Sequence, residues 1–157
     1  MPSRAIEDCV LELQSKINAF EVAMNAAGIP FMITCTARFV REQVALYAQG
    51  RETVEHTNYL RKLAGLSPIT FQENQHKVTW TLASKHIIDL DDNKPENDKA
   101  RAFDIAIVKD KRPVWSLKVD VNDNDIPDYD EAGAIGEAVG LRWGGKFPSP
   151  DRPHFEV

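Results

Sequence analysis

Apolar residues recur along the chain with two spacings, one typical of helices and the other of strands. Between residues 4 and 27 they step by three and four positions, which places them on one face of an amphipathic helix. Ser3 stands at the N-cap position of this helix, and Gly28 and Pro30 stop it. The same helical spacing predicts further helices at 40–52, 54–65 and 129–139.

Strands are predicted where apolar and β-branched residues run together or alternate with polar ones. The run FMITCTA at 31–37 is typical of a buried strand. The run RAFDIAIV at 101–108 alternates like a strand with one buried face. Shorter strands are predicted at 78–84, 114–119, 141–143 and 154–157.

The order of these elements indicates an α+β fold, because a parallel sheet would need regular alternation of strands and helices. We expect a small, mainly antiparallel sheet with helices packed to one side. No repeat, linker or low-complexity tract divides the chain, so residues 1–157 are expected to form one domain. Residues 1–29 supply its N-terminal helix, and residues 30–157 form the core that carries the candidate chemistry.

Composition and charge narrow the classes of partner. Of the 157 residues, 43% are hydrophobic, which is enough for one domain with its own core. The net charge is −5 and basic residues are scattered, so a nucleic-acid partner is not expected. No apolar run approaches the ~20 residues of a membrane span, and no secretory signal is evident, so we expect a cytoplasmic origin without membrane insertion. Cys9 and Cys35 match no metal or disulfide pattern and are expected to be buried, free thiols.

Two histidines and two aspartates stand out as candidates for a metal site. His86 follows the end of a predicted strand, where side chains can converge on a cleft. Asp104 lies in a predicted strand among apolar residues, where a carboxylate is costly to desolvate unless it is paired or metal-bound. Asp151 precedes His154 by three residues, near enough to serve the same centre. Catalytic zinc takes three protein ligands and leaves one position for water.

These residues belong to motifs that resemble, in the same order, those of the peptidoglycan zinc peptidases. That group contains the phage L-alanyl-D-glutamate endolysins and the VanX/VanY D-Ala-D-Ala peptidases. The segment at 34–52, with a Thr-x-x-x-Arg pattern followed by Tyr-Ala-Gln-Gly-Arg, is similar to the family's segment before the first ligand. The resemblance covers roughly residues 30–157 and rests on four further motifs: Ser84-x-His86, Ala102-x-Asp104, Trp143-Gly144-Gly145 and Asp151-x-x-His154.

The resemblance implies one zinc ion in a cleft, bound by His86, Asp104 and His154. It implies Asp151 as the acid–base carboxylate and Arg38 as the cation that polarises the scissile carbonyl. These roles agree with general chemistry, because zinc acidifies a water molecule and a neighbouring carboxylate can move its proton. Three further residues are expected to contact the substrate or wall the cleft: Ser84, Gln43 and Trp143.

The expected partner is the peptide stem of bacterial peptidoglycan. We favour an L-alanyl-D-glutamate endopeptidase of phage or prophage type, because the chain is small, has no evident signal or anchor, and carries Asp at 151 where Glu is the alternative. Such an enzyme is stored in the cytoplasm and acts on the wall after release, and a monomer is favoured. The nearest alternative is a D-alanyl-D-alanine carboxypeptidase or dipeptidase. An alternative of another class is a non-catalytic, zinc-stabilised cell-wall-binding domain.

The chain departs from the family pattern between its first two ligands. The family places them about seven residues apart, whereas an acidic insertion of roughly ten residues separates His86 from Asp104 here. The ligands can still meet if residues 87–100 loop out, because loop-closure entropy grows only slowly with length. Asp89, within the insertion, remains an alternative to Asp104. Phe39, after Arg38, replaces a residue that is commonly small and polar.

Two acidic stretches raise the question of a regulatory cation. In the segment 120–131, five residues fall at positions 1, 3, 5, 9 and 12 of a calcium loop: Asp120, Asn122, Asn124, Asp128 and Glu131. Asp125 stands where such a loop needs glycine. The alternative is a solvated turn that leads into a helix with Asp128 as N-cap, Glu131 as capping-box partner and Gly140 as stop. The acids at 89–98 form a second candidate cation site.

Overall fold

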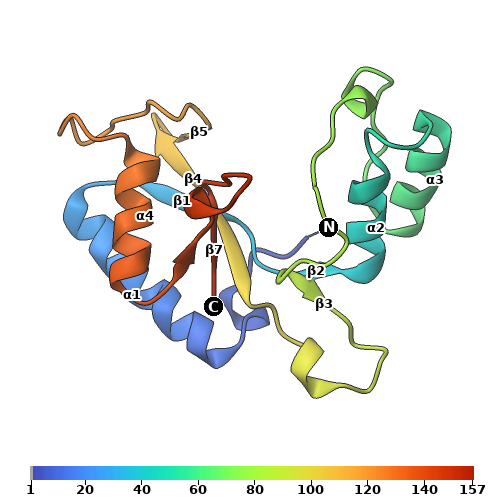
Figure 1. Cartoon of the computed structure of the whole chain (residues 1–157), viewed down its shortest axis with the longest axis horizontal. Helices are drawn as coiled ribbons and strands as arrows, with labels where there is room; N and C mark the ends of the chain where they lie inside the picture. The colour runs from blue at the N-terminus through green and yellow to red at the C-terminus, as the bar shows by residue number, and fades with distance from the viewer. Residues whose placement is uncertain (1) are drawn as a thin grey trace.

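A five-stranded sheet forms the centre of the computed structural model, which describes residues 2–157 (Figure 1). Strands β1 (Phe31–Cys35), β4 (Ala102–Lys109), β7 (His154–Glu156) and β6 (Arg142–Trp143) lie in this order across the sheet. The fifth strand, β5 (Arg112–Val114), pairs with the end of β4. Every pair in the sheet is antiparallel, which confirms the predicted sheet type and the α+β class.

Two helices, α1 (Leu11–Ala27) and α4 (Asp128–Ala138), cover one face of the sheet (Figure 1). The ring of Phe20 in α1 packs against Phe31, Phe103 and Phe155 of three strands, with ring centroids 5.0–5.7 Å apart. Because side chains alternate along a strand, the residues between these aromatics point to the opposite face. That opposite face carries the polar residues of the candidate site.

A second group of elements lies across the sheet from α1 and α4 (Figure 1). Helices α2 (Val40–Ala48) and α3 (Val54–Leu63) pack on each other, and β2 (Arg38–Phe39) pairs in parallel with β3 (Ile87–Ile88). Four short 3₁₀ helices complete the chain, at Ile6–Asp8, Glu73–Gln75, Pro95–Asn97 and Gly144–Lys146. None of the described helices is long and apolar enough to cross a bilayer.

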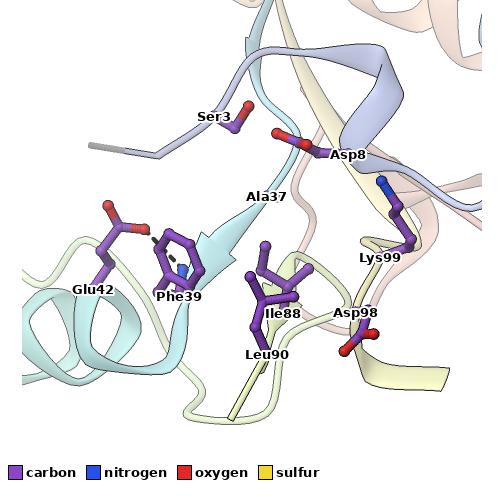
Figure 2. Close-up of a pocket in the computed structure, with 9 residues that line it drawn as sticks. All are labelled: Ser3, Asp8, Ala37, Phe39, Glu42, Ile88, Leu90, Asp98 and Lys99. Carbon is purple, nitrogen blue, oxygen red and sulfur yellow. Dashed lines mark hydrogen bonds between the residues drawn. The ribbon is translucent and has the colours of Figure 1, made fainter. Parts of the chain in front are cut away.

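The junction between β2 and α2 fixes the chain directly after Arg38. The backbone N–H of Phe39, the N-cap of α2, donates to the carboxylate of Glu42 at 2.8 Å. Figure 2 shows this bond beside a small pocket into which the side chains of Phe39, Ile88 and Leu90 project. Helix α2 therefore begins at a fixed angle to β2, and Arg38 is placed from a rigid support.

Three predicted elements differ in the structure. Of the strand predicted over 114–119, only Val114 belongs to a strand, at the end of β5. The helix predicted over 4–27 begins at Leu11, because the chain before it pairs with another segment: the N–H of Val10 donates to the carbonyl of Ala100 at 2.9 Å. The strand predicted over 78–84 is absent from the structure of that segment. Its carbonyl groups at Thr79 and Thr81 accept hydrogen bonds from the side chains of Arg51 and Gln43 instead of joining a ladder.

The acidic segment at 120–131 is a turn closed by its own hydrogen bonds. The predicted capping box is wrong: Asp128 is the first residue of α4, its carboxylate accepts the N–H of Val121, and the Glu131 carboxylate accepts the amides of Asn122 and Asn124. The predicted stop is confirmed by Gly140, whose φ is +89°. In the other acidic stretch, Asp89 and Asp92 accept local backbone N–H groups. Both cysteines are buried and free, as predicted.

Candidate metal centre

Three polar side chains converge on the face of the sheet opposite α1 and α4. Asp104 lies in β4 directly opposite His154 of β7 in the strand register, and His86 reaches them from the turn before β3. The Asp104 Oδ1 atom is 3.1 Å from His86 Nε2 and 3.0 Å from His154 Nδ1, and the two nitrogens are 3.3 Å apart. Residues 87–100 loop away, so the insertion does not keep the three apart.

Hydrogen bonds at the outer atoms orient both imidazole rings. His86 Nδ1 lies 2.7 Å from the carbonyl oxygen of Thr36, which can only accept a hydrogen bond, so Nδ1 carries a proton. The other nitrogen, Nε2, is then the atom whose lone pair can bind a metal. His154 Nε2 lies 2.9 Å from the Glu156 carboxylate, which leaves His154 Nδ1 for a metal. Histidines that bind metals are oriented in this way by carbonyl or carboxylate partners.

The donor set fits zinc. Bonds of about 2.0–2.2 Å at tetrahedral angles place ligand atoms about 3.3–3.6 Å apart, slightly more than the 3.0–3.3 Å between these atoms without a metal ion. Cys35 also lies within reach of His86 and Asp104. Its sulfur, however, faces His86 Nδ1 at 3.7 Å, the nitrogen already committed to Thr36. Cys35 therefore does not share a metal with His86 Nε2.

The charges of the cluster are strongly coupled. Burial disfavours the charged ring of His86, but the hydrogen bonds to Asp104 and Cys35, together with the charge of Asp104, outweigh burial and raise the pKa of His86 from 6.5 to about 10. The pKa of His154 is also raised, because its hydrogen bonds to Asp104 and Glu156 and the charge of Asp104 together outweigh its burial. Burial alone would raise the pKa of Asp104, yet the hydrogen bonds from His154 and His86 hold that pKa well below its usual range. The metal-free cluster therefore holds protons where zinc would bind.

Zinc is expected to stabilise the fold more at pH 8 than at pH 5.5. Zinc binds neutral imidazoles, so it must displace their protons. As the pH falls, the zinc affinity therefore weakens about tenfold per pH unit for each proton displaced. The metal-free fold behaves oppositely: the contribution of His86 is full below pH 6.5 and is lost as the pH rises toward about 10. At one fixed zinc concentration, about 100 times the Kd at pH 8, thermal unfolding should show a shift of about 5–10 °C at pH 8 and a smaller one at pH 5.5. Equal shifts would contradict this site.

Arg38 and Gln43 form a connected pair beside Asp104. Arg38 Nη2 is 3.4 Å from Asp104 Oδ2, and Arg38 Nη1 donates to Gln43 Oε1 at 3.3 Å. Gln43 is buried, and its Nε2 donates to Thr79 Oγ1 at 3.0 Å and to the carbonyl of Thr81 at 2.8 Å. Its amide is thus used within the protein, where it positions Arg38 and the loop at 79–81.

Asp151 lies at the cleft on a turn that leads directly into His154. Its N–H donates to the carbonyl of Gly144 at 2.8 Å, and its own carbonyl accepts the N–H of His154 at 3.2 Å. A Cβ at Gly144 would collide with that carbonyl of Asp151, so the turn requires glycine there. Partial burial of its carboxylate and, secondly, the charge of Asp104 raise the pKa of Asp151. A raised pKa suits a group that takes up and releases a proton.

Of the two remaining candidates for the cleft, Ser84 lines it and Trp143 does not. Ser84 lines the cleft, and its hydroxyl accepts the N–H of His86 at 3.3 Å. Trp143 points to the helix-covered face, where its ring lies against Gly133 and Gly145 and its Nε1 donates to the carbonyl of Arg152 at 2.8 Å. Trp143 packs against the core and does not line the cleft, in contrast to the expectation that it would wall it.

The cleft that contains these groups has a volume of about 820 Å³. Its lining comes mainly from the loop at 78–86, the turn at 147–151 and the polar face of the sheet. The indole rings of Trp80 and Trp115 border it and are 70% and 57% exposed. An open cleft of this size accommodates several residues of an extended peptide beside the three candidate ligands.

Glu156 is a part of the site that the sequence analysis missed. It is buried, and its carboxylate meets His154 Nε2 at 2.9 Å as well as Lys85 Nζ and Arg142 Nη1 at 3.2 Å each. A signal was available, because residues two apart in a strand face the same side and Glu156 follows His154 by two.

Replacing Glu156 by glutamine is expected to weaken zinc binding about 10- to 100-fold. Glutamine keeps the shape of the side chain but loses the negative charge, which makes the His154 ring more basic and so a stronger ligand for zinc. A competition titration against a zinc-binding dye measures the affinity. The matched control is Glu137→Gln, which removes a carboxylate paired with Lys146 outside the cleft. Equal affinities in wild type and Glu156→Gln would show that Glu156 does not support the metal.

Comparisons with known proteins agree with this geometry. Residues 98–157 match the model of a family described as D-alanyl-D-alanine carboxypeptidase, a part that holds Asp104, Asp151 and His154. The chain is similar in structure to the L-Ala D-Glu endopeptidase ChiX of Serratia marcescens, with a TM-score of 0.54 and 12% identity over 100% of this chain and 88% of that one. A search of curated proteins gives no match. The family match covers 60 of the 157 residues, and the structural neighbour shows that the two chains share a fold.

Proposed function

We propose that this chain, which has the fold of the VanX/VanY and endolysin type of peptidase, is a zinc-dependent enzyme that hydrolyses the L-Ala–D-Glu bond of the peptidoglycan stem. The observation that carries the proposal is the convergence of His86 Nε2, His154 Nδ1 and Asp104 Oδ1 within 3.0–3.3 Å of one another. These three residues would hold the zinc ion, and Arg38 and Asp151 complete the set needed for amide hydrolysis.

Each remaining polar group has a defined task in this proposal. When bound, zinc supplies a Lewis acid that polarises a carbonyl and lowers the pKa of water. Asp151 accepts a proton from the attacking water at its carboxylate and donates it to the departing amine nitrogen. Arg38 offsets the negative charge that develops on the carbonyl oxygen, a contribution worth about 10²–10³-fold for a single donor. Gln43 keeps Arg38 in place through the bond to Nη1.

The choice of scissile bond rests on the sequence and on the neighbour. Asp at position 151 favoured the endopeptidase, and ChiX is named as an L-Ala D-Glu endopeptidase. The family description favours the alternative, a D-alanyl-D-alanine carboxypeptidase with the same metal and acid–base groups. As a phage or prophage endolysin, the protein would act on the wall after release from the cell that makes it.

Digestion of purified muropeptides, followed by mass analysis of the products, tests the proposal. Cleavage after L-Ala is the expected result. Loss of a terminal D-Ala would favour the carboxypeptidase alternative. No turnover together with zinc-dependent binding to cell walls would favour the third candidate, a non-catalytic wall-binding domain, and would contradict a peptidase.

A further inference from the structure

Two cations lie on the polar face of the sheet, beside the candidate ligands. Arg142 of β6 stands opposite Glu156 of β7 in the strand register, and its Nη1 donates to Glu156 Oε1 at 3.2 Å. Lys85, next to His86, reaches the same oxygen at 3.2 Å. The other oxygen of Glu156 is bonded to His154, so both cations lie one residue away from a candidate ligand. All of these side chains line the cleft.

The guanidinium of Arg142 is held in a fixed orientation although its side chain is 66% exposed. Its Cζ lies 4.7 Å from the ring centroid of Phe147, and that ring packs against His154 with centroids 5.6 Å apart. Only Nη1 is bonded; within residues 2–157, Nε and Nη2 have no hydrogen-bond partner. These two groups form one edge of the planar guanidinium, the geometry that binds a carboxylate through two parallel hydrogen bonds.

The charge balance around Arg142 favours an anionic ligand. Lys85 and Arg142 share one oxygen of Glu156, and Lys85 Nζ also donates to the Val157 oxygen at 2.7 Å, so Glu156 neutralises the Arg142 guanidinium only in part. The third cation of the cleft, Arg38, is paired with Asp104.

We propose that Arg142, assisted by Lys85, binds a free carboxylate of the substrate on the amine side of the scissile bond. The inference rests on the proposed function, because it concerns how the same cleft selects its substrate. In the stem peptide D-Glu is linked through its γ-carboxyl group, so its α-carboxylate is free on the carbon attached to the scissile nitrogen. A terminal D-Ala carries its carboxylate on the corresponding carbon. Arg142 can therefore act as the anchor for the substrate carboxylate whichever of the two bonds is cleaved.

A pair of substrates that differ in one group tests this anchor. The zinc-loaded enzyme is assayed on a stem peptide with a free D-Glu α-carboxylate and on the same peptide with that group as a carboxamide. Wild type is expected to prefer the carboxylate by about tenfold in kcat/KM. In Arg142→Gln the preference should fall to about one, through a higher KM for the carboxylate peptide. Arg142→Lys should retain part of it, because lysine supplies the charge without the two parallel bonds.

Lys146→Gln is the matched control, because it removes an exposed cation that pairs with Glu137 outside the cleft, and its preference should equal that of wild type. If products identify the D-Ala–D-Ala bond, the pair becomes the pentapeptide and its C-terminal amide. Equal cleavage of both peptides by wild type would overturn the role of Arg142 as carboxylate anchor, but not the proposed function. An equal loss of kcat/KM on both peptides in Arg142→Gln would do the same, because it would indicate that Arg142 only supports Glu156. Cleavage of no peptide would overturn the proposed function, and the anchor with it.

Discussion

Replacing Asp151 by asparagine is expected to lower kcat on the stem peptide by about 10²–10⁴-fold while zinc stays bound. Asparagine has nearly the same shape, so the backbone bonds of residue 151 to Gly144 and His154 persist. It cannot take up a proton from water or deliver one to the departing amine. Activity needs the ionised carboxylate of Asp151, so we expect it to fall as the pH drops through the pKa of this group, which burial raises in the metal-free chain.

Kinetics and zinc content, measured on the same preparations, check this expectation. Asp110→Asn is a suitable control, because Asp110 is exposed in the turn after β4 with a φ of +52°, a conformation that asparagine accepts. With zinc saturating at each pH, the residual activity of Asp151→Asn should lack the acidic limb of the wild-type pH profile. Wild-type kcat in that variant would remove Asp151 from the mechanism.

Replacing His154 by alanine is expected to abolish zinc binding and to lower activity by about 10³-fold or more. The substitution removes one of three donor atoms and leaves the Asp104 and Glu156 carboxylates facing a gap. Metal analysis should give about one zinc per chain in wild type and little in the variant. The thermal shift produced by zinc at pH 8 should vanish as well.

His76→Ala provides the comparison for this variant, because His76 is exposed and does not line the cleft. It should bind zinc and turn over substrate like wild type. A circular dichroism spectrum establishes that the His154→Ala protein is folded. Full zinc content in a folded His154→Ala protein would mean that the metal lies elsewhere.

Most of the fold followed from local spacing, and the exceptions follow from contacts between distant segments. The sheet type was predictable from the order of strands and helices, and β4 places buried Phe103 and partly exposed Asp104 next to each other, as a strand with one helix-covered face does. The start of α1 was not, because it depends on the bond of Val10 to Ala100, about ninety residues away. The segment at 78–84 has strand-like composition, but side chains from α2 and the turn after it capture its carbonyl groups.

For the candidate site, the sequence supplied residue identities but not their arrangement. The motifs named His86, Asp104 and His154, and the structure brings these side chains together. Which ring nitrogen faces the centre depends on the Thr36 carbonyl and Glu156, to which no motif assigned a role. Gln43 was expected at the substrate and Trp143 at the cleft wall, yet both are used within the protein. Their type and spacing are the same in either role, so only the surrounding contacts distinguish the two.

Crystals of the zinc-loaded protein, measured at the zinc absorption edge, give the most direct test of the proposed centre. The anomalous difference map should show a single strong peak per chain. Its position should lie about 2.0–2.2 Å from Nε2 of His86, Nδ1 of His154 and a carboxylate oxygen of Asp104. A peak bound through the sulfur of Cys35, or a fully loaded protein whose peak lies away from these three side chains, would contradict the account.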